Sequence, residues 1–120
     1  MTAFGNDLNA RVVLTAEDLL AGNAMTFDII VPPALLRPGS EAGPAPETVV
    51  RLRPLTLGTF LLIMKAARED SSLIPLLMLQ EALVEPKLAL PQIRQMHLGL
   101  MTFLLGHVRQ ISGLTEKKSL

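Results

Sequence analysis

The chain of 120 residues contains no cysteine. Disulfide bonds and thiolate metal ligands are therefore excluded, and this composition fits a reducing compartment. Tryptophan and tyrosine are also absent and there are only four phenylalanines, although 49% of the residues are hydrophobic. The apolar side chains are therefore almost all Leu, Ile, Val, Met and Ala, which favours helices that pack through aliphatic contacts.

The chain has no excess charge of either sign, because eleven basic residues balance eleven acidic ones. The basic residues are scattered, so we expect no nucleic-acid partner, whose backbone requires a positive patch. No uncharged stretch reaches the roughly 18 to 20 apolar residues of a bilayer helix. Residues 1–10 are polar and include Asp7, unlike a secretory signal. We therefore expect a cytoplasmic protein without a membrane span.

Catalytic and metal-binding motifs are missing from the sequence as well. It has no Gly-rich phosphate loop or His-Glu metal motif, and "RPGSEAG" lacks the context of a nucleophile elbow. Glu81 and Glu85 resemble an acid–base pair, but carboxylates one turn apart usually form a solvated helix face. His97 and His107 lie too far apart on one helix to share a metal. We interpret them as core or interface residues, with pH sensing as the alternative. The sequence predicts neither an enzyme nor a catalytic, cofactor or metal site.

The N-terminal half predicts a short helix followed by a β-hairpin. "TAEDLL" places a threonine cap before two acidic residues, which is typical of a helix start, here near residues 16–22. "MTFDIIVPP" and "ETVVRLRPL" have strand patterns, and the strands at about 26–31 and 49–53 are expected to pair. Residues 33–46 between them are rich in proline and glycine. We expect an irregular loop there that is mobile until a partner binds, or a short turn around 34–37.

After Pro54 the hydrophobic pattern takes a helical period. Thr56 and Ser71 or Ser72 are suitable caps, Pro91 suits a first turn, and a glycine after Ser112 allows a left-handed end. The three helices are expected at 56–69, 73–84 and 91–112.

The sequence therefore predicts a single domain of the α+β class that is mainly α. Its short helix, β-hairpin and Pro-rich loop precede a three-helix unit. The expected parts of residues 1–120 are an N-terminal tail (1–14), the helix and hairpin (15–54), the helical unit (55–114) and a C-terminal tail (115–120).

The third expected helix has more apolar surface than one neighbour can cover. Its apolar residues span an arc of roughly 220° at about 100° per residue, whereas packing on one neighbour needs about 100°. We assign one side to the protein's own core: Ile93, Met96, Leu100, Phe103, Leu104 and Ile111. The other side is predicted to bind another protein chain: Leu98, Met101, Leu105 and Val108.

Three segments together resemble a known family: "VVRLRPLTLGTFLLIMKAARED", "LIPLLMLQEALVEPKLAL" and "FLLGHVRQISGL". They are similar to the small tail assembly chaperones of tailed bacteriophages and of related contractile injection systems. The resemblance covers about residues 47–114, whereas the first 46 residues depart from the simplest pattern. It implies a non-enzymatic protein that binds a tail, tape-measure or baseplate component through a Met-containing helical surface.

Two other functions remain open. The chain can be a permanent small component of a tail-like baseplate or hub, with the Pro-rich loop as a docking arm. It can also be a helical module that binds a ligand between its helices, although few polar groups converge there. The expected partners are other protein chains, further copies of this chain among them.

Overall fold

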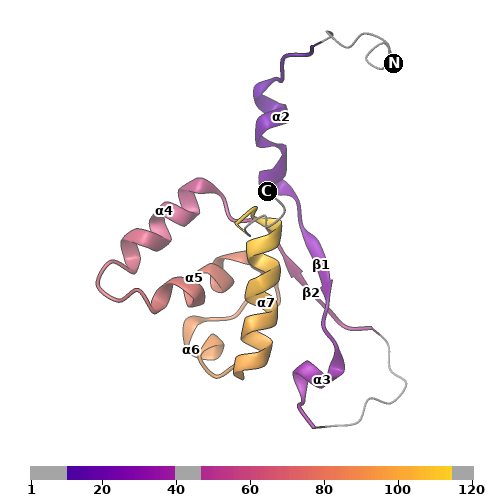
Figure 1. Ribbon diagram of the computed structural model, residues 1–120, viewed down its shortest axis with the longest axis vertical. Coiled ribbons are helices and arrows are strands. Elements are labelled where there is room, and N and C mark those ends of the chain that lie inside the picture. Colours follow the sequence, from indigo (N-terminus) through magenta and orange to yellow (C-terminus); the bar gives the residue numbers. More distant parts are fainter. Residues whose placement is uncertain (1–10, 40–46, 115–120) are drawn as a thin grey trace, which may run out of the picture.

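The computed structural model describes residues 11–39 and 47–114 of the protein (Figure 1). These residues form a mainly helical α+β fold with one small antiparallel sheet, which confirms the predicted fold class. Residues 40–46 of the loop predicted at 33–46, residues 1–10 of the predicted N-terminal tail and the whole predicted C-terminal tail lie outside the described residues.

The N-terminal helix forms where it was predicted. It comprises α2 (Ala16–Leu20) and the 3-10 turn η1 (Ala21–Ala24). Thr15 Oγ1 accepts a hydrogen bond from the Asp18 backbone N–H at 3.1 Å, and the Asp18 carboxylate accepts one from Thr15 N at 2.9 Å. These two bonds satisfy backbone donors that a helix start leaves free. The segment projects from the body of the molecule (Figure 1).

The predicted hairpin is confirmed, and a third strand joins it. Strand β1 (Phe27–Ile30) pairs with β2 (Val49–Leu52), and β2 pairs with β3 (Leu83–Glu85), both antiparallel. The predicted second helix therefore ends earlier than expected, at Ala82. The reason is the free edge of β2, whose backbone groups need partners: Leu83 pairs with Leu52, and Arg53 N donates to the Ala82 carbonyl.

The start of the Pro-rich segment is helical rather than irregular. Helix α3 (Pro33–Leu36) occupies the place of the short turn that was the alternative for this segment. Proline suits the first turn of a helix because its fixed φ matches the helical value. It has no backbone N–H, but in the first turn that group would have no acceptor within the helix. Leu35 also packs against the hydrophobic core, which favours an ordered turn.

The first two predicted helices are confirmed as α4 (Leu57–Ala66) and α5 (Leu73–Ala82). The third is not continuous: it divides into α6 (Leu90–Ile93) and α7 (Leu98–Ile111). The cause is His97, whose extended backbone lets its Nδ1 accept a hydrogen bond from Leu100 N while Nε2 contacts the Leu35 carbonyl. The predicted glycine end is confirmed, since Gly113 has φ +76°.

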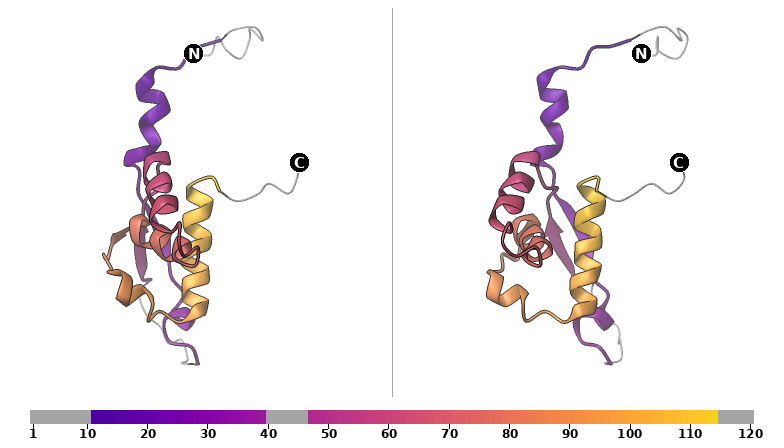
Figure 2. Two further views of the ribbon diagram at one scale, coloured as in Figure 1. Left: turned by 90° about the vertical axis from the view of Figure 1, so that its left-hand side faces the viewer. Right: turned by 60° about the vertical axis from the view of Figure 1, so that its left-hand side comes forward.

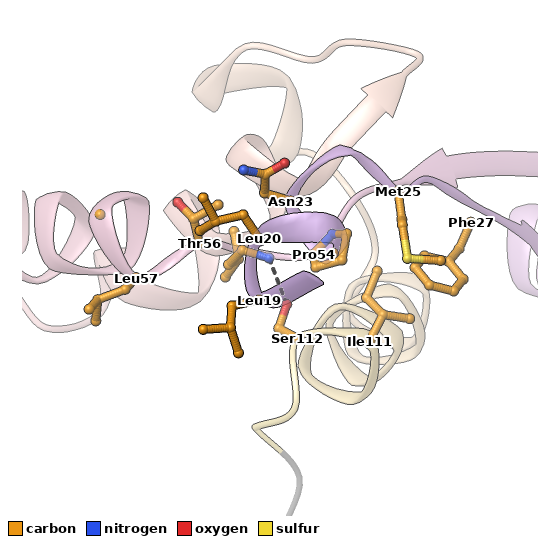
Figure 3. A pocket seen from close by; sticks show the side chains of 13 residues that line it. Leu19, Leu20, Asn23, Met25, Phe27, Pro54, Thr56, Leu57, Ile111 and Ser112 are labelled. Atoms are coloured by element: carbon orange, nitrogen blue, oxygen red, sulfur yellow. Dashed lines mark hydrogen bonds between the residues drawn. The ribbon is translucent and has the colours of Figure 1, made fainter. Parts of the chain in front are cut away.

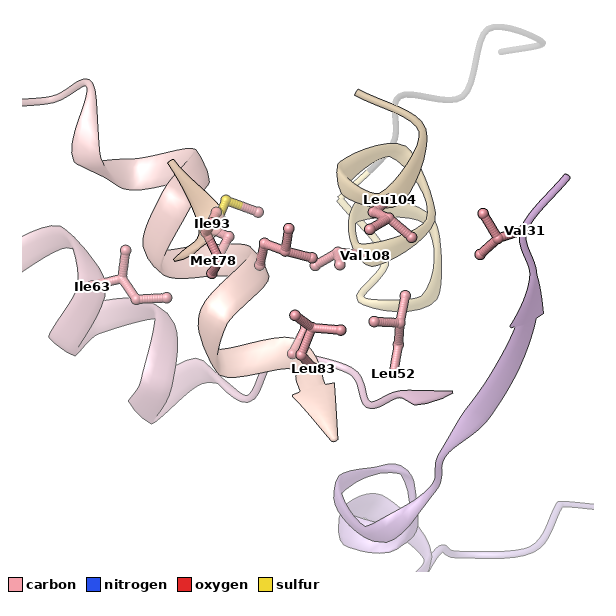
Figure 4. Close-up of a cluster of buried hydrophobic side chains, with 10 residues drawn as sticks. Val31, Leu52, Ile63, Met78, Leu83, Ile93, Leu104 and Val108 are labelled. Carbon is pink, nitrogen blue, oxygen red and sulfur yellow. The ribbon is translucent and has the colours of Figure 1, made fainter. Parts of the chain in front are cut away.

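The hydrophobic core lies between the sheet, α5 and α7 (Figures 1 and 4). Helix α7 packs against both α5 and α3, while α4 packs on α5 at the side away from the hairpin (Figure 2). The largest fully buried side chains come from β2, α5, β3, α6 and α7, in that order: Leu52, Leu79, Leu83, Ile93 and Val108. Helix α4 contributes only Ile63 from its own residues to this core.

Candidate protein-binding surfaces

An open apolar groove runs along the outer side of α7, with a volume of about 690 Å³. Its α7 side is built from residues three or four apart, which share one face of a helix. The start of α5 forms the opposite wall, where Pro75 is tolerated because it lies in the first turn. The apolar lining residues are Pro75, Leu76, Leu98, Met101 and Leu105.

The structure brings three of the four predicted binding residues into this groove. Leu98 is 79% exposed, and Met101 and Leu105 are half-buried at its floor. Val108 is the exception, because its side chain is 0% exposed and belongs to the core. Its assignment to the binding side was therefore wrong. Helix α5 packs against α7, and Val108 points into the core between them. The buried side of α7 is therefore wider than the sequence predicted, and it ends at Met101 and Leu105.

The predicted core side of this region is confirmed. Ile93 and Leu104 are buried, and the remaining assigned residues are partly buried against the core: Met96, Leu100, Phe103 and Ile111. Met101 and Leu105 touch the same core with part of their surface. Each of these two side chains therefore packs on the core with one part of its surface and lines the groove with the other.

Two arginines give the groove a positive rim. Arg94 lies at its α6 end and Arg109 at the end of α7. Within residues 11–39 and 47–114, neither guanidinium lies within ion-pair distance of a carboxylate. The Asp70 carboxyl has a lowered pKa mainly because Ser72 donates hydrogen bonds to it, with a smaller contribution from the charge of Arg94. The groove therefore combines an aliphatic floor with positive charge at its ends.

The histidines make structural contacts, as the interpretation of core or interface residues predicted. His97 caps α7 and contacts α3 through Leu35. His107 packs edge-on against Phe103, with ring centroids 4.7 Å apart. Glu81 and Glu85 do not share a helix face, because Glu85 lies on β3. Among the described residues, no group of three His, Asp or Glu side chains is placed to hold a metal ion.

A second apolar surface was not predicted from the sequence. Every residue from 11 to 26 is exposed, and several large apolar side chains of α4 are exposed as well. A pocket of about 540 Å³ connects these two regions (Figure 3). The signal was present in "LGTFLLIMKA", which is apolar on nearly all sides of a helix that is too short to be covered all round.

Comparisons with protein-family models, curated protein sequences and solved structures find no match to this chain. In the part of the chain that the structure describes, no helix is long and apolar enough to cross a membrane.

Proposed function

We propose that this chain is a non-enzymatic protein-binding factor that holds an amphipathic helix of another protein in the α7 groove. The observation that carries the proposal is the aliphatic floor of Leu98, Met101 and Leu105 between Arg94 and Arg109. A helix binds such a groove through apolar residues at three- and four-residue spacing. The methionine at its centre adapts to different side chains, which suits a protein that receives more than one segment.

The charged rim specifies the kind of helix that fits. Arg94 and Arg109 make no ion pair with another described residue, so acidic side chains on the client can approach both. Opposite charges at the edge of an interface raise the association rate and select orientation more than they raise affinity. We therefore propose an amphipathic client helix whose apolar stripe is flanked by Asp or Glu.

The class of client follows from the resemblance of residues 47–114 to small tail assembly chaperones. It supports a tail, tape-measure or baseplate component of a phage or contractile injection system as the client, held before or during assembly. A permanent role in a baseplate or hub is the alternative within the same class. A ligand-binding module is less well supported, because an open groove of about 690 Å³ exposes a small molecule to water on one side.

The test is co-purification of the tagged chain from its native host, followed by mass spectrometry. The wild-type chain is compared with a Met101→Glu and Leu105→Glu double variant, which places two carboxylates on the groove floor. Gln110→Glu is the matched control, because it adds a carboxylate to an exposed position of the same helix. We expect wild type and control to recover the same tail component. The groove variant is expected to lose it while its circular dichroism spectrum still shows the helical fold.

Three outcomes contradict parts of the proposal. If the groove variant retains the client, the groove is not the binding surface. If finished particles contain the chain at fixed stoichiometry, it is a permanent component rather than a transient chaperone. If the purified protein carries one small molecule per chain in native mass spectrometry and no protein client, it is a ligand-binding module.

A further inference from the structure

The N-terminal arm, residues 11–25, exposes an apolar side to solvent. Leu19 and Leu20 are 69% and 62% exposed, and Ala16 lies on the same side of α2. Asp18 lies on the opposite side and Glu17 at the edge of the apolar side, so the short helix is amphipathic. Helices below roughly 12 residues are marginal in water without tertiary packing. The arm therefore requires a surface that the body of its own chain does not supply in this structure.

Helix α4 exposes an apolar stripe of a similar length. Leu57, Leu61 and Met64 are separated by four and three residues and so lie along one face of the helix. Leu57 is 73% exposed and Leu61 is 56% exposed. Helix α4 packs on α5, and its residue Ile63 and its C-cap residue Ala67 are buried. The stripe is therefore an exposed apolar surface on a helix that α5 holds in place.

The arm and the stripe meet at the pocket of about 540 Å³. Leu19 and Leu20 line it from the arm, and Leu57 lines it from the first turn of α4 (Figure 3). The arm then continues away from the body beyond this point (Figures 1 and 2). One continuous apolar surface therefore runs from a projecting segment to a fixed helix face.

The charges beside the two surfaces are opposite. The arm carries two acidic residues, Glu17 and Asp18. The far end of the stripe is followed by Lys65 and Arg68, neither of which forms an ion pair with another described residue. Helix α2 with the 3-10 turn η1 and the ten-residue α4 both extend about 15 to 16 Å. An arm laid along α4 with its apolar side on the stripe therefore matches α4 in length. Glu17, at the edge of that apolar side, is opposite in charge to Lys65 and Arg68 at the end of α4.

We infer that the arm of one copy packs along the α4 stripe of a second copy, and that the two chains form a reciprocal two-fold dimer. Each chain carries one arm and one stripe, so a two-fold axis near the pocket makes two identical contacts and leaves neither apolar surface exposed. This contact is independent of the α7 groove, which remains free for a client in each chain.

Sedimentation velocity with the full chain tests the inference. The wild type is expected at twice the 13.0 kDa chain mass. Leu19→Glu with Leu20→Glu on the arm, or Leu57→Glu with Leu61→Glu on the stripe, is expected to give a folded monomer with an unchanged circular dichroism spectrum. Its melting temperature is expected to be lower than that of the wild-type dimer, because association stabilises the folded state. Ile30→Glu is the matched control, because Ile30 is 52% exposed and lies outside both surfaces. A wild-type monomer at high micromolar concentration overturns the inference.

Mixing the two monomeric variants gives a sharper test. One chain then supplies an intact stripe and the other an intact arm, so a heterodimer held by one contact is expected, weaker than the wild-type dimer. A mixture that remains fully monomeric overturns the reciprocal arrangement. The Met101→Glu and Leu105→Glu variant is expected to dimerise normally, so failure of the dimer and failure of the proposed client site are distinguishable.

Engineered disulfides separate contact between chains from contact within one chain. The sequence has no cysteine, so each introduced pair reports a single contact. Leu20→Cys in one chain and Leu61→Cys in the other are expected to form a cross-linked heterodimer on oxidation. Both substitutions in one chain are expected to yield linked dimers. If that chain instead closes an internal disulfide and runs as a monomer, the arm folds onto its own α4 and the inference is wrong.

Discussion

The backbone N–H of Leu55 donates a hydrogen bond to Ser112 Oγ at 2.9 Å (Figure 3). Leu55 lies in the short segment between β2 and α4, and Ser112 is the C-cap of α7. The bond therefore ties the start of the helical unit to its last helix, beside the pocket where the arm leaves the body. A serine at the end of a helix thus has a tertiary role in addition to a local one.

Replacing this serine is expected to destabilise the fold. Ser112→Ala leaves the partly buried N–H of Leu55 without its acceptor, so we expect the free energy of unfolding to fall by about 1 to 2 kcal/mol. Urea denaturation followed by circular dichroism measures the change. Ser71→Ala, at an exposed position, is the control and is expected to change stability by less than about 0.5 kcal/mol. Equal effects of the two substitutions would show that the bond contributes nothing.

The corrected position of Val108 predicts a clear difference between two residues of α7. Val108→Ala removes two buried methyl groups from a closed core and is expected to cost about 2 kcal/mol of unfolding free energy. Leu98→Ala, at a position that is 79% exposed, is expected to change stability by less than about 0.5 kcal/mol. Thermal melting of both variants measures the contrast. A small effect of Val108→Ala would mean that Val108 is not a core residue and belongs to the binding side.

His97 is expected to stabilise the chain through two separate contacts. His97→Ala removes the cap on α7 and the contact with the Leu35 carbonyl, at an expected cost of about 1 to 3 kcal/mol. His97→Asn keeps a side-chain acceptor for the N–H of Leu100 but is too short to reach α3, so it is expected to lose less. Chemical denaturation of both variants separates the contributions. Equal losses would mean that the cap adds nothing.

Acid is expected to weaken the sheet through Asp28. Arg51 lies 2.8 Å from the Asp28 carboxylate and 3.2 Å from Glu85, so it links the three strands. The hydrogen bond from Arg51 holds the pKa of Asp28 below its ordinary value of 3.8. A carboxyl with a lowered folded-state pKa contributes stability above its unfolded pKa and loses it as the pH falls through the folded value.

The predicted effect is a difference in slope. We expect the free energy of unfolding of the wild type to decrease as the pH falls from about 5 into the acid range, and that of Asp28→Asn to decrease less steeply. Glu69→Gln is the control, because it removes one exposed carboxylate that forms no ion pair with another described residue. Denaturation curves at several pH values provide the measurement. Parallel pH profiles for wild type and Asp28→Asn would contradict the prediction.

Local signals in the sequence were sufficient for most elements. The alternation in "ETVVRLRPL" and the cap and acidic residues in "TAEDLL" depend on neighbours within one strand or one turn, so the hairpin and α2 were predictable. Helices α4 and α5 followed from their apolar period and their breaks. Strand β3 was not predictable in this way, because Leu83–Glu85 is extended only where β2 offers an open edge from a distant part of the chain.

The same distinction between local signals and long-range contacts applies to the apolar surface of α7. The sequence by itself determined that α7 would carry more apolar side chains than its own core needs, since that depends only on residue type and helical period. Only the tertiary structure decided which of them remain exposed. Packing of α5 buries Val108, and the bond of His97 to a carbonyl 62 residues away breaks the third helix before α7. Both depend on contacts between segments far apart in sequence, whose geometry the pattern within one segment does not contain.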